Sequence, residues 1–371
     1  MKKLLSLILC VLMVLPIVSC GQQTQGNPTG SKSNEGSQQG AESNGKKVVF
    51  FCNNLGDMSI SDDGQRGMDR LKNEYGYVTQ TVETGPDPSK FESYIFDVCE
   101  SGADFIIASS LYQEQVEKIA PEYPDIGFVV YDVDADQQPT TDNILYTVFA
   151  PNEGSYLVGM IGAAMSESGV IGCVGGMQIP IIEDFMTGYI QGALAYNPDI
   201  KVAISWVGNW TDSPKMLELC TQQHNSFDVD FFFPIAGGAG LGAFEAATNI
   251  GGIWTSGVDS DQHALFAAED NALADVILTS MLKKVGESFV SIFADYLEGK
   301  EYWGTVKTYG IKENSIGYVN NEIYQKNVPE EVQVAVAQAE ADIQSGKLKV
   351  KSYFDFANEA EFLEYAATVA P

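Results

Sequence analysis

The sequence predicts an α/β protein built of two doubly wound lobes that face each other across a ligand-binding cleft. Apolar, strand-like runs alternate with helix-like stretches along the chain, which is typical of parallel sheets covered by helices. The alternation occurs in two successive stretches, each of ordinary domain size. Acidic, hydroxyl and glycine residues follow several predicted strands directly, and ligands of open α/β sheets bind at the carboxyl ends of the strands.

The first stretch is predicted to alternate strands and helices from residue 47 to residue 149. Its first strand reads KVVFFCN, which is apolar enough to be buried inside a sheet. The helix predicted at 88–99 is amphipathic, so it can cover one face of that sheet. The predicted strands are 47–53, 77–82, 105–109, 127–132 and 143–149, and the predicted helices are 64–75, 88–99 and 113–123.

The second stretch repeats the pattern and is best defined at residues 227–262. There the strand 231–235 is apolar on both faces, a glycine-rich loop follows it, and a helix begins at Ala243. Glycines let the backbone turn sharply and approach a ligand closely. The other predicted strands are 170–174, 202–207, 253–258, 303–307 and 316–319. The other predicted helices are 154–166, 182–197, 213–223, 273–297 and 328–345, with a short one in the tail 355–367.

Two facing lobes require the chain to cross between them, and we expect crossings near Phe149, near Asp259 and near Lys307. The N-terminal lobe is then predicted to comprise residues 47–148 with 262–307, and the C-terminal lobe residues 149–261 with 308–371.

The N-terminal residues are typical of an exported lipoprotein. Residues 1–19 have a charged start and an apolar stretch that is too short to span a bilayer comfortably. They end in Ile17-Val18-Ser19 before Cys20, which resembles the bacterial lipobox, whose cysteine is lipidated; the alternative is an ordinary signal peptide with a chance cysteine. Residues 20–46 are rich in Gly, Ser, Gln and Asn and are expected to form a flexible tether. We therefore expect a domain anchored to the cell membrane by lipid at Cys20, outside the cytoplasm.

Composition excludes several classes of function. The formal net charge of −29 argues against a nucleic-acid partner, which requires a basic surface. The cysteines beyond Cys20 are far apart and are expected to be buried free thiols. With 2 histidines and no Cys-x-x-Cys pair, neither a metal site nor a cofactor is expected.

Three strand ends carry candidate ligand-binding residues. Asp57, Ser59 and Ser61 follow the first strand, and Asp132 ends the strand GFVVYD. These side chains could hold a polar ligand, but they could equally cap a helix or face solvent. Trp210 lies on a loop after a strand, where it offers a stacking surface for a planar ligand or is simply a partly buried loop aromatic.

The glycine loop also admits an enzyme interpretation. Gly238, Gly240 and Ala243 satisfy the loose dinucleotide-binding pattern, with Asp259 about twenty residues later. The loop lies in the middle of the chain, however, and an exported protein meets little NAD. No nucleophile elbow followed by an acid and a histidine is present. We expect Asp259 to bind hydroxyl groups, and we predict no catalytic residue.

The order and spacing of the motifs resemble the basic membrane protein family of substrate-binding lipoproteins, which includes the purine nucleoside receptors of ABC transporters. The resemblance runs from about Val48 to Lys347. It implies a type I periplasmic-binding-protein fold with a three-crossing hinge, and no catalysis. The segments that carry it are LGDMS at 55–59, EGSYLVG at 153–159, GGM at 175–177 with IP at 179–180, DSPK at 212–215, AGGAGLG at 236–242, GVDSDQ at 257–262, and TS at 279–280 with Lys283.

Carried over by position, the resemblance implies roles for individual side chains. Asp57 and Asp132 would face the base, and Trp210 would stack on it where the family usually has a phenylalanine. Asp259 and Lys283 would hold the ribose. Ser59 and Gly238 complete the set of expected ligand-binding residues, as members of the first motif and of the glycine motif.

The first motif departs from the family pattern, which continues Ser-Phe-Asn where this chain has Ser59-Ile60-Ser61. Ile60 cannot stack as an aromatic ring does, and Ser61 replaces an amide that both donates and accepts. One stacking wall is therefore missing, or is supplied by another residue such as Tyr112 or Phe149.

The resulting hypothesis is a monomeric, lipid-anchored binding protein of an ABC importer, with a purine nucleoside as its ligand. Its lobes would close over the nucleoside, and the closed form would dock on a membrane permease that works with a separate ATPase. The alternatives are the same fold binding a sugar or another small ligand, a sensor or surface lipoprotein without a transport role, and an NAD-binding enzyme.

Overall fold

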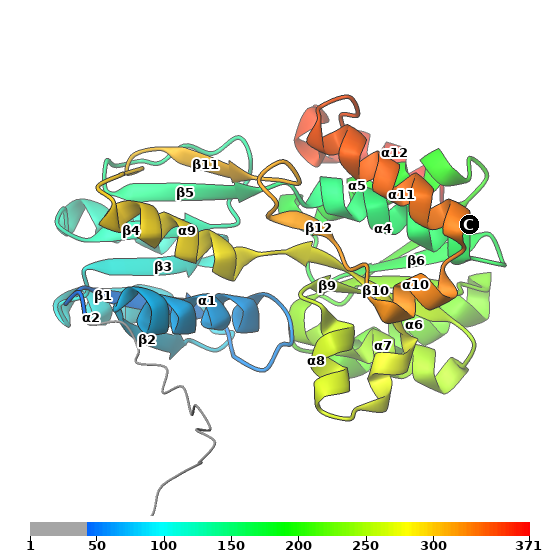
Figure 1. Ribbon diagram of the computed structural model, residues 1–371, viewed down its shortest axis with the longest axis horizontal. Coiled ribbons are helices and arrows are strands. Elements are labelled where there is room, and N and C mark those ends of the chain that lie inside the picture. The colour runs from blue at the N-terminus through cyan, green and yellow to red at the C-terminus, as the bar shows by residue number, and fades with distance from the viewer. Residues whose placement is uncertain (1–42) are drawn as a thin grey trace, which may run out of the picture. The chain divides into compact units, whose positions relative to one another are not determined.

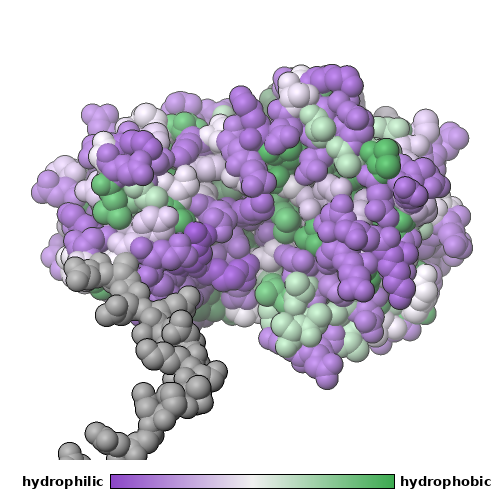
Figure 2. Space-filling view, in the orientation of Figure 1, coloured by the Kyte–Doolittle hydropathy of each residue, from purple (hydrophilic) through white to green (hydrophobic). Residues whose placement is uncertain are grey.

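The computed structural model describes residues 43–371 and arranges them around two six-stranded sheets (Figure 1). The strand order is β11-β5-β4-β3-β1-β2 in one sheet and β12-β10-β9-β8-β6-β7 in the other. The expected signal peptide, the expected lipidation site Cys20 and nearly all of the expected tether lie outside the described residues. Within 43–371, no helix is long and apolar enough to cross a membrane. The face seen in Figure 2 is mainly hydrophilic, in keeping with the strongly acidic composition.

The first lobe is a parallel sheet with helices on both faces. Because successive side chains of a strand point to opposite faces, Phe50 of β1 lies in the core beneath α1 and α9, and Phe51 lies in the core beneath α2 and α3. The strands are β1 (Lys47–Cys52), β2 (Val78–Glu83), β3 (Phe105–Ser109), β4 (Gly127–Tyr131), β5 (Ile144–Phe149) and β11 (Val306–Tyr309). The helices are α1 (Ile60–Tyr75), α2 (Phe91–Glu100), α3 (Gln113–Ile119) and α9 (Val285–Leu297).

The second lobe repeats this architecture, except that its edge strand β12 runs antiparallel to β10. Its strands are β6 (Val170–Gly175), β7 (Lys201–Trp206), β8 (Phe231–Ile235), β9 (Trp254–Asp259), β10 (Ile277–Lys283) and β12 (Ile316–Tyr318). Its helices are α4 (Pro151–Met165), α5 (Pro180–Tyr196), α6 (Ser213–Phe227), α7 (Leu241–Ile250), α8 (Gln262–Ala268), α10 (Glu322–Asn327), α11 (Glu330–Gln344) and α12 (Glu359–Ala367).

The two sheets have matching strand orders. Read from the β11 and β12 edges, β5 corresponds to β10, β4 to β9 and β3 to β8. The carboxyl ends of β4 and β9 therefore occupy equivalent positions in the two lobes, and Asp132 and Asp259 lie at these ends.

Helices α4 and α5 of the second lobe pack unusually closely, and glycine makes this possible. A Cβ atom at Gly188 would lie 2.0 Å from the carbonyl oxygen of Asn152, and one at Gly192 would lie 1.8 Å from that of Tyr156. No other residue type leaves room for such an approach. The contact fixes α5 along its length, and the first turn of α5 supplies Ile181 and Ile182 to the cavity described below.

One predicted element is wrong, and it moves a lobe boundary. The predicted helix 273–297 is in fact two elements, because Ile277–Lys283 is strand β10 and only Val285–Leu297 is helical. β10 is buried, and it pairs with β9 and β12 in the second sheet. The chain therefore returns to the first lobe after Lys283, not near Asp259, and the segment 262–283 belongs to the second lobe instead of the first.

The chain passes between the lobes at three places in the described part. The first passage lies between the end of β5 at Phe149 and the start of α4 at Pro151. The second lies between Lys283 and Val285, and the third lies between β11 and β12.

The four cysteines of the described part are free and buried, as predicted. Burial raises the pKa of Cys52 and of Cys99 to about 12. These side chains are therefore thiols at neutral pH, and they fill the core as small apolar groups.

Candidate ligand-binding site

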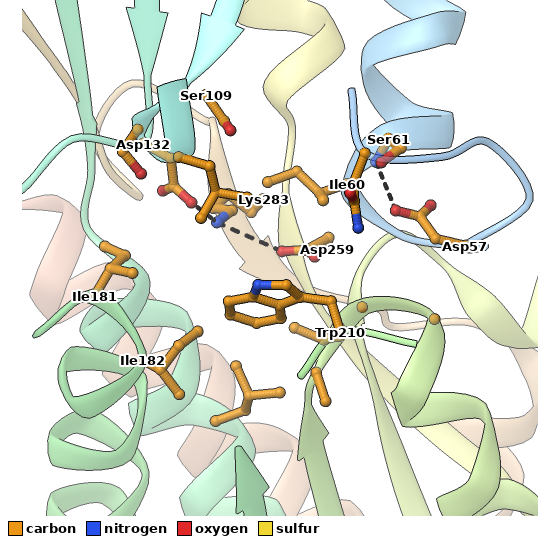
Figure 3. A pocket seen from close by; sticks show the side chains of 18 of the residues that line it. Asp57, Ile60, Ser61, Ser109, Asp132, Ile181, Ile182, Trp210, Asp259 and Lys283 are labelled. Atoms are coloured by element: carbon orange, nitrogen blue, oxygen red, sulfur yellow. Dashed lines mark hydrogen bonds and ion pairs between the residues drawn. The ribbon is translucent and has the colours of Figure 1, made fainter. Parts of the chain in front are cut away.

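A cavity lies where the carboxyl ends of strands from both lobes meet (Figure 3). Residues that follow β1, β3 and β4 line it from the first lobe, and the ends of β8, β9 and β10 line it from the second. The sequence-predicted residues that line it are Asp57, Ile60, Ser61, Asp132, Trp210, Gly238, Asp259 and Lys283. Ser59 does not line the cavity, but its hydroxyl donates a hydrogen bond of 2.6 Å to Asp259 Oδ2.

A lysine placed between two acids forms the polar centre of the cavity. Lys283 is only 2 % exposed, and its Nζ lies 2.7 Å from Asp132 Oδ2 and 3.8 Å from Asp259 Oδ1. Asp132 follows β4 of the first lobe and Asp259 ends β9 of the second, so the lysine connects the lobes. Its Nζ also lies 5.1 Å from the ring centroid of Phe185, which adds a cation–π contact.

Each of the two acids keeps one oxygen without a hydrogen-bond partner, although Asp259 Oδ1 also lies 3.8 Å from the Lys283 ammonium group. Among residues 43–371, neither Asp132 Oδ1 nor Asp259 Oδ1 has a hydrogen-bond partner, although both atoms are buried. A buried acceptor without a donor is costly. Asp132 Oδ1 and Asp259 Oδ1 are therefore acceptors at the cavity that no donor of the described residues uses.

The backbone at both acids is left-handed. Asp132 has a φ of 62° and Asp259 a φ of 63°, a conformation uncommon for residues other than glycine. Aspartate tolerates it better than bulky residues do. The same turn at equivalent strand ends places a carboxylate at the cavity from each lobe, and such backbone strain is typical of functional sites.

Burial and charge shift the protonation of this cluster. Burial raises the pKa of Asp259 to about 6, against the opposing effects of Lys283 and the Ser59 hydroxyl. Burial would lower the pKa of Lys283, but the carboxylates of Asp132 and Asp259 together raise it above its ordinary value. At neutral pH the lysine is therefore charged and Asp259 is a carboxylate.

This protonation predicts that affinity for a hydroxyl-bearing ligand depends on pH. A protonated Asp259 accepts hydrogen bonds poorly, so we expect nearly constant affinity above pH ~7 and a loss approaching roughly tenfold per pH unit below about 6. The stability of the ligand-free protein should change in the opposite sense. A folded-state pKa raised from 3.8 to about 6 gives a stabilising contribution that is lost as the pH rises through 6.

Titration calorimetry and thermal unfolding at pH 5, 6, 7 and 8 would test both trends. Asp259→Asn should remove the pH dependence of the affinity. A dependence that persists unchanged in Asp259→Asn would assign it to another group.

Asp57 has a structural role besides lining the cavity. Its carboxylate accepts hydrogen bonds from the backbone N–H groups of Ser59 (2.8 Å), Ser61 (2.9 Å) and Asp62 (3.2 Å). It thus satisfies free donors at the start of α1, which is the capping alternative that the sequence left open. Burial raises the pKa of Asp57 despite these bonds.

The aromatic lining differs from the expectation. Trp210 lies beside the Lys283–Asp259 pair (Figure 3). Phe185 of α5 also contributes an aromatic ring to the lining. Neither residue suggested as a replacement wall lines the cavity. The hydroxyl of Tyr112 bonds to Thr84 Oγ1 in the core at 2.7 Å, and Phe149 stacks on Tyr309.

Several lining residues were missed by the sequence analysis. Ser109 and Ser110 follow β3, so the strand-end rule that selected Asp57 and Asp132 could have found them. A further group is apolar and carries no signal in the sequence, because isoleucine at a cavity is indistinguishable from isoleucine in a core. These residues are Ile179, Ile181, Ile182 and Ile235.

The glycine loop supports the aromatic side of the cavity. Gly237–Gly240 forms a short 3-10 turn before α7, and the N–H of Ala239 donates to the carbonyl oxygen of Trp210 at 2.8 Å. A Cβ at Gly238 would lie 3.8 Å from that of Asp57 across the cleft. The loop thus positions Trp210 from the second lobe while Gly238 faces the first.

Residues 45–349 match the family described as "ABC transporter substrate-binding protein PnrA-like". The chain belongs to this family. It is 32% identical over 323 residues to the "ABC transporter nucleoside-binding protein BmpA" of Lactococcus lactis subsp. cremoris, a match that covers 82% of this chain and 88% of that protein. It is 29% identical over 282 residues to "Basic membrane protein A" of Borreliella burgdorferi, covering 74% and 79%.

The fold of this PnrA-like protein is the type I periplasmic-binding-protein fold. A solved ABC transporter solute-binding protein from Aeropyrum pernix K1 superposes with a TM-score of 0.74 at 23% identity, covering 87% of this chain and 97% of that one. A solute-binding protein from Conexibacter woesei gives a TM-score of 0.66 at 20% identity, with 83% and 99% covered. These likenesses confirm the predicted fold.

Family membership also decides the class of function. PnrA-like proteins are extracytoplasmic substrate-binding proteins that work with the permease and ATPase of an ABC transporter, and they are not enzymes. The dehydrogenase alternative raised by the glycine loop is therefore wrong, and the predicted absence of catalysis is confirmed at the level of the family.

Proposed function

We propose that this PnrA-like protein is a lipid-anchored receptor that delivers ribonucleosides, purine nucleosides in particular, to an ABC importer. The observation that carries the proposal is the pair of free, buried oxygens Asp132 Oδ1 and Asp259 Oδ1 around the ammonium group of Lys283. Two acceptors beside one donor complement two neighbouring hydroxyl groups, as in the 2′,3′-diol of ribose. The name of the Lactococcus relative, a nucleoside-binding protein, supports the same ligand class.

The remaining lining suits a planar base. Trp210 supplies a broad apolar face next to the diol-binding centre, and Ile60, Ile181 and Ile182 supply apolar surface around it (Figure 3). Aromatic stacking tolerates any base. Ser61, Ser109 and Asn53 add polar groups that can bond to the edge of the base.

Transport follows from closure of the two lobes. The lysine and the two acids come from both lobes, so a ligand that bonds to all three favours the closed arrangement. In this proposal the closed monomer docks on the permease, and a lipid at Cys20 with the tether of residues 21–46 keeps it at the membrane. A type I fold that served as a sensor would bind the ligand equally but would not support its uptake.

Restoring the second aromatic wall should strengthen binding. Ile60→Phe is expected to improve nucleoside affinity several-fold, about 1 kcal/mol, because a base held between the introduced ring and Trp210 gains an additional stacking contact. Affinity for free ribose should not change. Titration calorimetry with inosine and ribose measures both, and Ile60→Leu is the control that alters shape without adding a ring. Weaker inosine binding by Ile60→Phe would show that the base does not lie against this wall.

A thermal-shift screen of residues 43–371 tests the proposal directly. Ribonucleosides, 2′-deoxynucleosides, free bases and pentoses should be compared at equal concentration. A ligand at a hundred times its Kd adds about 2.7 kcal/mol of stability, so ribonucleosides should raise Tm clearly, and deoxynucleosides and free bases should do so less. A response to pentoses without one to nucleosides would replace the nucleoside by a sugar. Uptake of labelled nucleoside by cells with and without the gene then separates transport from sensing.

A further inference from the structure

The loop that joins β1 to α1 reaches across the cleft and contacts the second lobe with an apolar side chain. Met58 packs against a small hydrophobic cluster made of Phe244, Phe266, Ala274 and Ile277, which belong to or flank α7, α8 and β10. Leu241 and Leu273 pack against the same cluster. Figure 1 shows the loop beside α8. We call residues 55–59 the clasp loop and this cluster the socket.

Met58 does not line the ligand cavity. Its contact is therefore one between lobes and not one with the ligand. The socket lies wholly in the second lobe, whereas Met58 is carried by the first, so separation of the lobes would expose both apolar surfaces to water.

The clasp loop is held in place by hydrogen bonds from within the first lobe. Asp62 accepts hydrogen bonds from the backbone N–H groups of Gly56 and Met58, each of 2.8 Å. Asp57 accepts those of Ser59 and Ser61, so two carboxylates of the first lobe fix the loop from within that lobe. A loop that is already ordered loses little conformational entropy when it makes a new contact.

The backbone of Met58 adopts a conformation that the surrounding loop must impose on it. Its φ is 52°, a left-handed conformation that is rare for a bulky residue other than glycine. The conformation directs the side chain away from the first lobe and toward the socket. Strained backbone of this kind persists where the surrounding structure determines it.

Polar contacts between the lobes flank the methionine. The Ser59 hydroxyl donates to Asp259 Oδ2 at 2.6 Å, and the Arg66 guanidinium donates to the hydroxyl of Ser260 at 2.7 Å. The hydroxyl of Ser260 in turn donates to the carbonyl oxygen of Ser59 at 3.3 Å. The clasp loop thus joins the lobes at the strand end that carries Asp259.

We propose that the clasp loop is a ligand-independent latch in which Met58 acts as a positioning residue that sets the lifetime of the closed state. Entry of Met58 into the socket brings Ser59 to Asp259 and so orients a carboxylate of the ligand site without touching the ligand. The test of this latch by ligand dissociation rests on the proposed function, whereas the contact between Met58 and the socket does not depend on any ligand.

Met58→Ala tests the latch through the kinetics of binding. We expect the dissociation rate constant of inosine to rise by about tenfold, because the lost contact exists only when the lobes are together, with an association rate constant changed less than about threefold. Stopped-flow tryptophan fluorescence measures both constants. Met58→Leu should behave almost like the wild type, because it keeps the apolar contact.

Met165→Ala is the matched control for a loss of packing alone. Met165 is also half-buried, but it packs against the main hydrophobic core and not against the socket, and it lies outside the cavity. The Met165→Ala substitution should lower Tm without changing the dissociation rate constant of inosine. Leu273→Ala, on the socket side, should reproduce the effect of Met58→Ala, and the double variant should be little worse than either single variant. Additive effects of the two substitutions, or an unchanged dissociation rate in Met58→Ala, would overturn the latch.

A measurement without ligand separates this inference from the proposed function. Small-angle X-ray scattering of the ligand-free protein should give a larger radius of gyration for Met58→Ala than for the wild type or Met165→Ala. If the wild type fails to bind inosine but this difference appears, the nucleoside proposal fails and the latch stands. If inosine binds while Met58→Ala changes neither the radius of gyration nor the dissociation rate, the latch is wrong and the nucleoside proposal stands.

Discussion

Lys283→Met is expected to destabilise the ligand-free protein by about 3–5 kcal/mol and to abolish nucleoside binding, because it leaves two buried carboxylates without their shared cation. Methionine has a similar length, so the cavity keeps its shape and only the charge is lost. The remaining acids would repel each other at neutral pH. The stability deficit should shrink toward pH 5, because protonation of Asp259, whose pKa is already raised by burial, relieves the repulsion.

Urea unfolding at pH 7 and pH 5 measures this effect, with Lys284→Met as the control. Lys284 is the next residue, but its ammonium group bonds to the backbone oxygen of Asn314 at the surface. Its replacement should change stability by no more than about 0.5 kcal/mol. Equal effects of the two substitutions would mean that Lys283 is not the buried partner of the acids.

Asp259→Asn is expected to weaken ribonucleoside binding by about a hundredfold. A hydrogen bond to a charged acceptor contributes about 1.5–3 kcal/mol, and the substitution removes the charge while it also disturbs the ion pair with Lys283. If the free Oδ1 atom accepts a bond from a ribose hydroxyl, the deoxynucleoside that lacks this hydroxyl should lose much less affinity. The variant would then discriminate poorly between ribo- and deoxyribonucleosides.

Asp261→Asn is the matched control for this substitution. Asp261 lies two residues away, and its side chain accepts a hydrogen bond from the N–H of Ala264 as the N-cap of α8. Asparagine caps a helix as well as aspartate does, so both stability and affinity should be unchanged. Titration calorimetry with guanosine and 2′-deoxyguanosine gives the comparison. An equal loss for both ligands would place the diol elsewhere in the cavity.

The strand-end rule explains why so much of the cavity could be predicted. Asp57 and Asp132 follow buried strands and Asp259 ends one, and parallel topology brings such positions to one edge of a sheet. What the rule could not decide is the use of each acid. Asp57 bonds to three local N–H groups, whereas Asp132 and Asp259 each keep one oxygen free, and only the folded loop shows the difference.

The incorrect prediction of a single helix over residues 273–297 has a physical cause. Residues 277–283 are buried within the sheet, and a short apolar run of this kind fits a buried helix as well as a buried strand. Pairing with β9 and β12 decides the matter, and pairing depends on residues far away in the chain. The isoleucine wall was missed for a related reason, since apolar residues reveal burial but not whether they face a core or a ligand.

The equivalent positions of Asp132 and Asp259 bear on the origin of the site. Matching strand orders and the same left-handed turn at the same strand end are what duplication of one ancestral α/β unit would leave behind. The last residue of β10 is Lys283, but that of the equivalent β5 is Phe149. The lysine is therefore the point at which the two otherwise equivalent halves of the site differ, and it offsets one of the two facing negative charges.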